Sequence, residues 1–278
     1  MYLRGLALIV VAACSSSPPG SGDDVGPTDA TMGHVDAPRA TDGAAPIMLT
    51  PGQSTINITV AGHPRTAILY VPSMATTASQ FVIALHGNGD TAANFLATSG
   101  LKPLADADGT VLVVPQGLTR DVVVGNQTLQ GIDWDAYNSA ANGNIDLPFL
   151  DQLRTQIVGT NQVDSHHVFV FGYSQGGYLS FEYGMIAGAS LACSAVLAAS
   201  SPYGGASNDP LITGAARKLA VVLQIGTLDS AYTAAQTTEA TLQAMSFPTQ
   251  LNAIPNVGHV PIPGDVKLPW MFCRGQSH

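Results

Sequence analysis

Ser174 lies in a sequence context that favours a nucleophilic serine. It is the centre of Gly172-Tyr173-Ser174-Gln175-Gly176, which follows an apolar run typical of a buried strand and precedes a stretch with helical spacing. A strand, a G-x-S-x-G turn and a helix together expose a serine hydroxyl at the edge of a sheet. The glycines are needed because a Cβ at position 172 or 176 would collide with the neighbouring strand or helix. A glycine-rich turn with an incidental serine is the alternative interpretation. A nucleophilic serine would also require a base and an acid elsewhere in the chain.

A serine hydroxyl is a weak nucleophile that needs a base oriented by a carboxylate. In folds with this turn the chain order is serine, acid, histidine, each on a loop after a strand. His259 is the histidine that follows Ser174 and lies just past a predicted strand. Asp229 directly follows the predicted strand at 219–225 and is the predicted acid, and Asp209, in the middle of the preceding loop, is the alternative.

Acyl transfer also needs hydrogen-bond donors for a developing oxyanion. The backbone N–H of Gln175, directly after the serine, is the first predicted donor. The second is expected in His86-Gly87-Asn88-Gly89, which follows a buried strand upstream of the serine. The N–H of Asn88 is the preferred candidate there, and that of Gly89 is the second choice.

Apolar strands alternate with helices along the chain, which predicts a mostly parallel sheet covered by helices on both faces. A hairpin at the start of the folded part would add an antiparallel edge. The expected strands are residues 55–60, 67–71, 81–85, 110–115, 166–171, 192–199, 219–225 and 250–254, and the expected helices begin at 91, 144, 178 and 234.

Ligands of such sheets bind beyond the carboxyl ends of the strands. Three long loops are expected at that edge, residues 116–143, 200–216 and 226–233. The first is long for a compact domain, which is typical of functional loops. Its Trp134 and Tyr137 are the candidates for a substrate-binding wall, and ordinary core packing is the alternative for Trp134.

The composition limits the classes of partner and site. The 278 residues are 46% hydrophobic and carry a net charge of −9 with no basic cluster, so a disordered chain and a nucleic-acid partner are not expected. The three cysteines show no zinc spacing. In an oxidising compartment Cys193 and Cys273 form a pair that a disulfide could join. Alternatively, Cys193 packs as a small apolar residue in its buried strand.

The first residues indicate export. Residues 1–13 have the basic start and short apolar core of a signal peptide, and Val11-Ala12-Ala13-Cys14 resembles the bacterial lipobox, in which Cys14 would be lipidated. Residues 14–46 are an acidic stretch rich in Pro, Gly, Ser and Asp, expected to be a disordered tether. Residues 47–278 are the predicted catalytic domain. We expect a protein of the bacterial cell envelope, anchored by lipid in the outer membrane, with ordinary secretion as the alternative.

Taken together, these residues resemble the α/β-hydrolases that include feruloyl esterases, acetylxylan esterases and polyhydroxybutyrate depolymerases. The motifs that carry the resemblance are Leu85-His86-Gly87-Asn88-Gly89, Asn144-Ile145-Asp146-Leu147-Pro148-Phe149, Val163-Asp164, Gly172-Tyr173-Ser174-Gln175-Gly176-Gly177, Gly226-Thr227-Leu228-Asp229 and Gly258-His259. The chain departs from the family at Val257-Gly258-His259-Val260-Pro261 and at Gly131-Ile132-Asp133-Trp134, where family members often have a Gly-Gly-His-x-Trp-Pro run and a patch rich in Cys and Trp.

The resemblance implies an α/β-hydrolase fold and a serine esterase with the triad Ser174, Asp229 and His259. It implies no metal or organic cofactor and a small or polymeric ester as substrate, and we expect a monomer. A serine peptidase of the same fold is the first alternative. A non-catalytic surface-binding lipoprotein is the alternative from another class.

Overall fold

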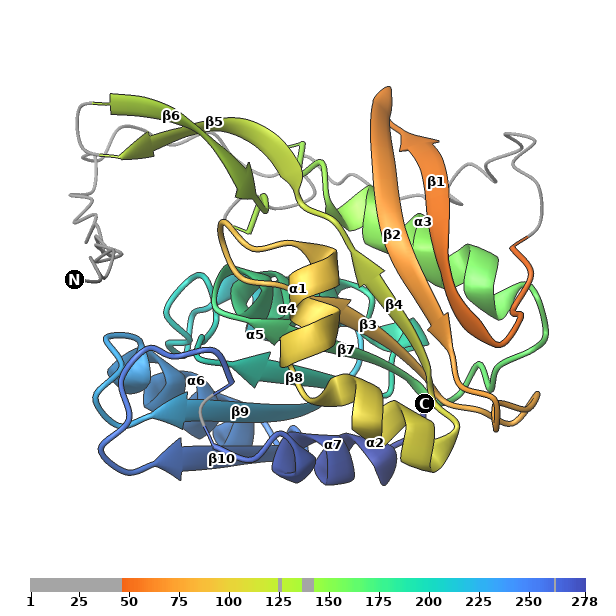
Figure 1. The fold of residues 1–278 in the computed structure, drawn as a ribbon. Helices are drawn as coiled ribbons and strands as arrows, with labels where there is room; N and C mark the ends of the chain where they lie inside the picture. Colours follow the sequence, from red (N-terminus) through yellow and green to blue (C-terminus); the bar gives the residue numbers. More distant parts are fainter. Residues whose placement is uncertain (1–46, 125–126, 137–142, 263) are drawn as a thin grey trace, which may run out of the picture.

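The computed structural model describes residues 47–124, 127–136, 143–262 and 264–278 (Figure 1). The predicted signal peptide, Cys14 and the tether lie outside the described residues, as does Tyr137. No helix of the described part is both long and apolar enough to cross a membrane.

An eight-stranded sheet forms the centre of the molecule, with the strand order β1-β2-β4-β3-β7-β8-β9-β10. All neighbours from β4 to β10 are parallel, whereas β1 pairs antiparallel with β2 and β2 antiparallel with β4. The prediction of a mostly parallel sheet with an antiparallel N-terminal hairpin is therefore confirmed. The strands are β1 (Gly52–Val60), β2 (His63–Val71), β3 (Phe81–Leu85), β4 (Val111–Pro115), β7 (Val168–Tyr173), β8 (Cys193–Leu197), β9 (Ala220–Gly226) and β10 (Thr249–Ile254).

Helices bury both faces of this sheet. One apolar cluster contains side chains of α3, α4, α5 and α6, and a second contains side chains of α1, α2 and α7. Because both faces are covered, every residue of β3, β4, β8 and β9 is buried, which explains why their sequences are largely apolar. The helices are α1 (Ala92–Thr98), α2 (Leu101–Asp108), α3 (Leu147–Val158), α4 (Gln175–Ile186), α5 (Pro210–Thr213), α6 (Tyr232–Ala244) and α7 (Lys267–Arg274).

Helix α3 begins at Leu147 rather than at the predicted residue 144. The side-chain Oδ1 of Asn144 accepts hydrogen bonds from the backbone N–H groups of Asp146 and Leu147 at 2.8 and 3.0 Å. Asn144 thus satisfies N–H groups that have no partner inside the helix, which is the reason that the helix starts after it.

The segment 116–143, which was expected to be one long loop, contains a second, two-stranded sheet. Strands β5 (Leu118–Val124) and β6 (Gln127–Asp133) pair antiparallel, with Leu118 opposite Asp133. Figure 1 shows this ribbon leaving the main sheet and extending on the side toward which β8, β9 and β10 point. The hairpin therefore rises from the edge at which a ligand site was expected.

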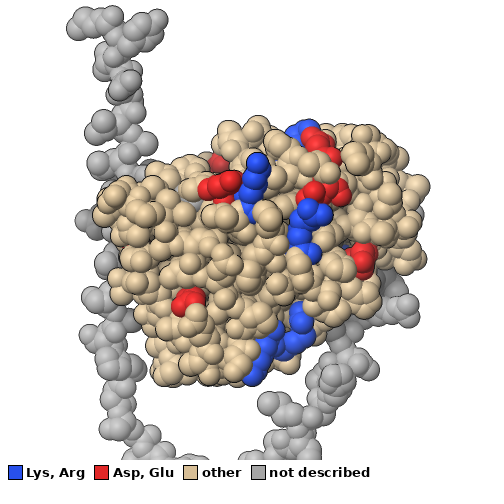
Figure 2. All heavy atoms as spheres, turned by 90° about the horizontal axis from the view of Figure 1, so that it is seen from below, with Lys and Arg blue, Asp and Glu red and all other residues tan. Residues whose placement is uncertain are grey.

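The surface carries few charges. On the face seen in Figure 2 most of the surface is uncharged, and the Lys, Arg, Asp and Glu side chains form only small groups, several of them with both charges side by side.

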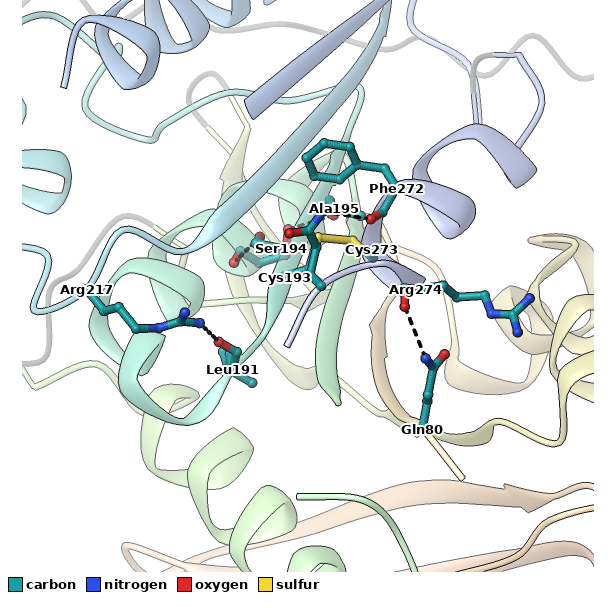
Figure 3. Close-up of a disulfide and its surroundings, with 11 residues drawn as sticks. Gln80, Leu191, Cys193, Ser194, Ala195, Arg217, Phe272, Cys273 and Arg274 are labelled. Atoms are coloured by element: carbon teal, nitrogen blue, oxygen red, sulfur yellow. Dashed lines mark hydrogen bonds between the residues drawn. A yellow bond between two sulfur atoms is a disulfide. The ribbon is translucent and has the colours of Figure 1, made fainter. Parts of the chain in front are cut away.

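A disulfide joins Cys193, the first residue of β8, to Cys273 in α7 (Figure 3). The sequence left open whether Cys193 forms a disulfide with Cys273 or packs as a free cysteine, and the structure has the disulfide. Both cysteines are fully buried, and Trp270, one turn before Cys273, packs edge-on against Phe171 of β7. The bridge and this aromatic contact hold α7 against the sheet.

Replacing both cysteines by alanine is expected to lower the free energy of unfolding by about 4 kcal/mol. The bridge spans a sequence separation of 80 residues, and closing a loop of that length restricts the unfolded chain by about this amount in the loop-entropy model. Urea unfolding of the oxidised protein and of the double variant measures the difference. Equal midpoints, or two free thiols in the denatured, unreduced chain without Cys14, would contradict the bridge.

Candidate active site

Ser174 occupies the turn between β7 and α4 in a strained backbone conformation, with φ of 54° and ψ of −119°. The turn is so tight that a Cβ on Gly172 would lie 1.9 Å from the carbonyl oxygen of Gly176. A Cβ on Gly176 would lie 2.4 Å from the carbonyl oxygen of His86 in the loop after β3. The glycines of the motif are therefore required by close backbone approach, as predicted.

The structure brings Ser174 and His259 together, although 85 residues separate them in the chain. The Oγ of Ser174 lies 2.8 Å from Nε2 of His259. The Nδ1 of the same imidazole lies 2.7 Å from Oδ2 of Asp229. Because a carboxylate only accepts hydrogen bonds, Nδ1 carries the hydrogen and Nε2 is left to accept the serine proton. The arrangement can therefore activate the hydroxyl of Ser174.

Asp229 is fixed for this contact. Its side chain is fully buried, and its Oδ1 accepts a hydrogen bond from the backbone N–H of Ala231 at 2.9 Å. Behind it, Gly226 packs against the loop that carries the histidine, since a Cβ there would lie 2.1 Å from the carbonyl oxygen of Val257. The acid and the base thus lie on adjoining loops after the neighbouring strands β9 and β10.

Asp209, the alternative acid, has a different role. Its Oδ1 accepts from the N–H groups of Leu211 and Ile212 at the start of α5, and its Oδ2 accepts from Ser201 and Gly205. These contacts make it a helix cap and an organiser of its own loop. No contact between Asp209 and His259 is present in the described part of the chain.

The two predicted oxyanion donors also lie at this site. The loop with Gly87 lies beside the serine, since a Cβ on Gly87 would lie 3.5 Å from Cβ of Ser174. The N–H of Gly89 is bonded to the carbonyl oxygen of Ile132 at 2.8 Å, which removes it as a donor. The N–H groups of Asn88 and Gln175 have no acceptor among the residues that the structure describes. Of the two candidates in this loop, the geometry therefore favours Asn88.

The sequence pattern of the phospholipase/carboxylesterase family matches residues 66–263, more than half of the chain. The chain belongs to this family. The matched region contains Ser174, Asp229 and His259.

Individual relatives are more distant. NocK from Nocardia uniformis subsp. tsuyamanensis, a proposed esterase, is 25% identical over 190 residues, which are 63% of this chain and 50% of NocK. The chain thus spans about half the length of this curated relative. Acetyl xylan esterase from Aspergillus awamori has 17% identity and a TM-score of 0.61, over 79% of this chain and 99% of that chain. The poly(3-hydroxybutyrate) depolymerase LpqC from Bordetella parapertussis has 17% identity and a TM-score of 0.55, over 76% and 86%. These likenesses confirm the α/β-hydrolase fold.

Trp134 is buried, which corrects its predicted role as a substrate-binding wall. Only 1% of the residue is exposed. Its ring packs on His86 with the centroids 4.8 Å apart, and its Nε1–H donates to the carbonyl oxygen of His86 at 2.8 Å. Trp134 therefore supports the loop that carries Asn88, and its ring is not available to a substrate.

His86 supports the same loop from inside. Its Nδ1–H donates to the carbonyl oxygen of Gly87 at 2.7 Å, and its Nε2 accepts from the N–H of Gly117 at 3.0 Å. Burial lowers the pKa of His86, so the imidazole stays neutral and keeps this pair of hydrogen bonds. The sequence motif His-Gly predicted a donor loop but not this use of the imidazole.

Sequence reasoning also missed Glu182, a fully buried carboxyl group on α4. Burial and the nearby carboxylates of Asp135 and Asp146 raise the pKa of Glu182 to about 8. Its Oε1 has no hydrogen-bond partner among the described residues, and its Oε2 lies 3.5 Å from Nδ2 of Asn144. The raised pKa favours the neutral carboxylic acid at pH 7, and a lone glutamate in a helical sequence gave no signal for it. The structure shows no cluster of three or more His, Cys, Asp or Glu side chains suited to a metal within its described ranges.

Replacing Glu182 by glutamine is expected to flatten the dependence of stability on pH. The pKa of Glu182 rises from 4.5 to about 8 on folding, so between these values the folded state holds a proton that the unfolded state has released. Stability is then lost as the pH rises through this window, by at most about 1.4 kcal/mol per pH unit. Thermal midpoints of both proteins from pH 5 to pH 9 measure the effect. The same pH slope in both would contradict a raised pKa.

Proposed function

We propose that the protein is an exported serine esterase that hydrolyses carboxylic esters through Ser174, His259 and Asp229. The observation that carries the proposal is the continuous hydrogen-bonded chain from Ser174 through His259 to the buried Asp229. Membership of the phospholipase/carboxylesterase family supports the same reaction class.

The geometry supports the following sequence of steps. His259 Nε2 takes the proton of Ser174 while Oγ attacks the ester carbonyl carbon, and the carbonyl oxygen becomes an oxyanion between the N–H groups of Asn88 and Gln175. The protonated imidazole then gives its proton to the leaving alkoxide, which releases an alcohol and leaves an acyl-enzyme. Water attacks the acyl-enzyme by the same route and releases the acid. Asp229 holds the imidazole tautomer and stabilises its positive charge.

For the substrate we propose ester-linked acyl groups of polysaccharides or polyesters, of the acetyl, hydroxycinnamoyl or 3-hydroxybutyryl class. The support is the similarity in fold to enzymes described as an acetyl xylan esterase, a ferulic acid esterase and a poly(3-hydroxybutyrate) depolymerase. Two apolar side chains adjoin the triad in the chain and are exposed, Leu228 at 68% and Val260 at 40%. Exposed apolar side chains of this kind suit contact with an acyl chain or a polymer surface.

A substrate panel tests this proposal. It contains soluble esters of acetate, ferulate and 3-hydroxybutyrate and a peptide amide of comparable size. We expect turnover of at least one ester and no turnover of the amide. Hydrolysis of the amide alone would favour a serine peptidase, and turnover of neither would favour a non-catalytic binding protein.

We also propose that the enzyme is held at the cell envelope by a lipid on Cys14. The support is Val11-Ala12-Ala13-Cys14 followed by a long polar stretch. Replacement of Cys14 by serine should move the protein from the membrane fraction to the soluble fraction. A wild type that is already soluble would contradict the anchor.

A further inference from the structure

The β5–β6 hairpin contacts the site through Asp133, the last residue of β6. Oδ1 of Asp133 accepts a hydrogen bond from Nδ2 of Asn88 at 3.0 Å and a second from Nε2 of Gln175. Asn88 and Gln175 are the two residues whose backbone N–H groups were assigned above as oxyanion donors. A single carboxylate oxygen therefore joins the side chains of both donor residues.

Further hydrogen bonds join Asn88 and Gln175 to each other and to the end of β6. Nδ2 of Asn88 lies 3.3 Å from Oε1 of Gln175, so the two amides also contact each other. Oε1 of Gln175 accepts the backbone N–H of Trp134 at 3.0 Å, and the N–H of Gly89 is bonded to Ile132. The strand end at 132–134 is thus bonded to the donor loop on one side and to the start of α4 on the other.

The charge of Asp133 is balanced by Arg120 on the partner strand. Nε and a terminal nitrogen of Arg120 lie 2.8 and 2.7 Å from Oδ2 of Asp133. The carboxylate is only 13% exposed, so its charge is poorly screened by water. Without the guanidinium, a negative charge next to the site would oppose the developing oxyanion.

We propose that Asp133 is a positioning residue that locks the oxyanion donors Asn88 and Gln175 relative to each other, with Arg120 neutralising its charge. The inference rests on the proposed esterase function. The backbone N–H of Asn88 lies in an exposed loop, whereas that of Gln175 is fixed by α4. Asp133 couples the two through their side-chain amides, and it does not itself touch the reacting atoms.

The test compares esters with the matching thionoesters, in which sulfur replaces the carbonyl oxygen. Sulfur accepts hydrogen bonds weakly, so a thionoester gains little from the oxyanion donors. Asp133→Ala is expected to lower kcat for an acetate ester by about 10- to 100-fold, less than the loss of a whole donor, with KM changed by less than about threefold. The preference for ester over thionoester is expected to fall by a similar factor. Rates are expressed per active site titrated with a fluorophosphonate, so that unfolded protein is not counted.

Two further variants separate positioning from general damage. Asp121→Asn removes a carboxylate from the same hairpin and should leave kcat and the ester preference within about twofold of wild type. Arg120→Gln should lower kcat, because the charge of Asp133 is then uncompensated, and adding Asp133→Asn should restore part of the loss. A double variant no better than Arg120→Gln would contradict the role of the charge.

An unchanged preference for ester over thionoester in Asp133→Ala would overturn the proposal even if kcat falls. A merely structural change would lower the rate on the ester and the rate on the thionoester by the same factor. The activity of the wild-type enzyme distinguishes a failure of the role of Asp133 from a failure of the proposed esterase function. If it hydrolyses the ester and the preference is unchanged in the variant, only the role of Asp133 fails. If wild type hydrolyses no ester, the proposed function fails and this inference fails with it.

Discussion

Replacement of Ser174 by alanine is expected to lower kcat/KM for ester hydrolysis by about 10⁵- to 10⁶-fold, the size of loss seen when a triad nucleophile is removed. The hydroxyl that lies 2.8 Å from His259 is then absent, and no acyl-enzyme can form. Initial rates on the preferred ester of the panel measure the loss. Ser174 is a half-buried residue in a turn and loses only one oxygen atom in this replacement, so the fold should be retained, and thermal unfolding provides the control.

The same reasoning predicts that the losses are not additive. Replacing His259 by alanine should cost about as much as replacing Ser174, and the double variant should be little worse than either single variant. A serine without its base and a base without its serine are equally unable to form the acyl-enzyme. Independent, multiplicative losses would show that the two residues do not act as a unit.

Asp229→Asn is expected to lower kcat by about 10³- to 10⁴-fold with the structure intact. An amide at this position can donate to Nδ1 and so favours the wrong imidazole tautomer, and it also removes the charge that stabilises the imidazolium. Kinetics on the preferred ester of the panel measure this loss.

Asp209→Asn is the matched control for the acid. Asp209 accepts four hydrogen bonds within its own loop, so its replacement should lower the thermal midpoint while the rate per folded molecule stays within a fewfold of wild type. Near-normal turnover in Asp229→Asn together with inactivity of folded Asp209→Asn would reverse the assignment of the acid.

The sheet, and the residues that the structure brings together as a candidate triad, could be predicted because each leaves a signal within a few residues. The strands β3, β4, β8 and β9 are buried on both faces, and their sequences are therefore largely apolar. Ser174 is marked by the glycines that its turn requires. Asp229 and His259 follow from the rule that catalytic loops lie after strands, applied in chain order.

The features that were missed or left open depend on contacts across the fold. Asp133 has no spacing signature, because its partners Asn88 and Gln175 lie 45 and 42 residues away in the chain. The burial of Trp134 depends on where the loop with His86 lies, which its own neighbours in sequence do not specify. The disulfide was left open for the same reason, since its formation depends on the 5.3 Å between the Cα atoms of Cys193 and Cys273.

The most direct test of the central claim is mass spectrometry of the protein after reaction with a fluorophosphonate. We predict one adduct per chain, located by peptide mapping on Ser174, and loss of ester hydrolysis in proportion to labelling. Ser174→Ala should take up no label. An adduct on another serine that abolishes hydrolysis, or full hydrolysis by a Ser174-labelled enzyme, would contradict the assignment of Ser174 as the nucleophile.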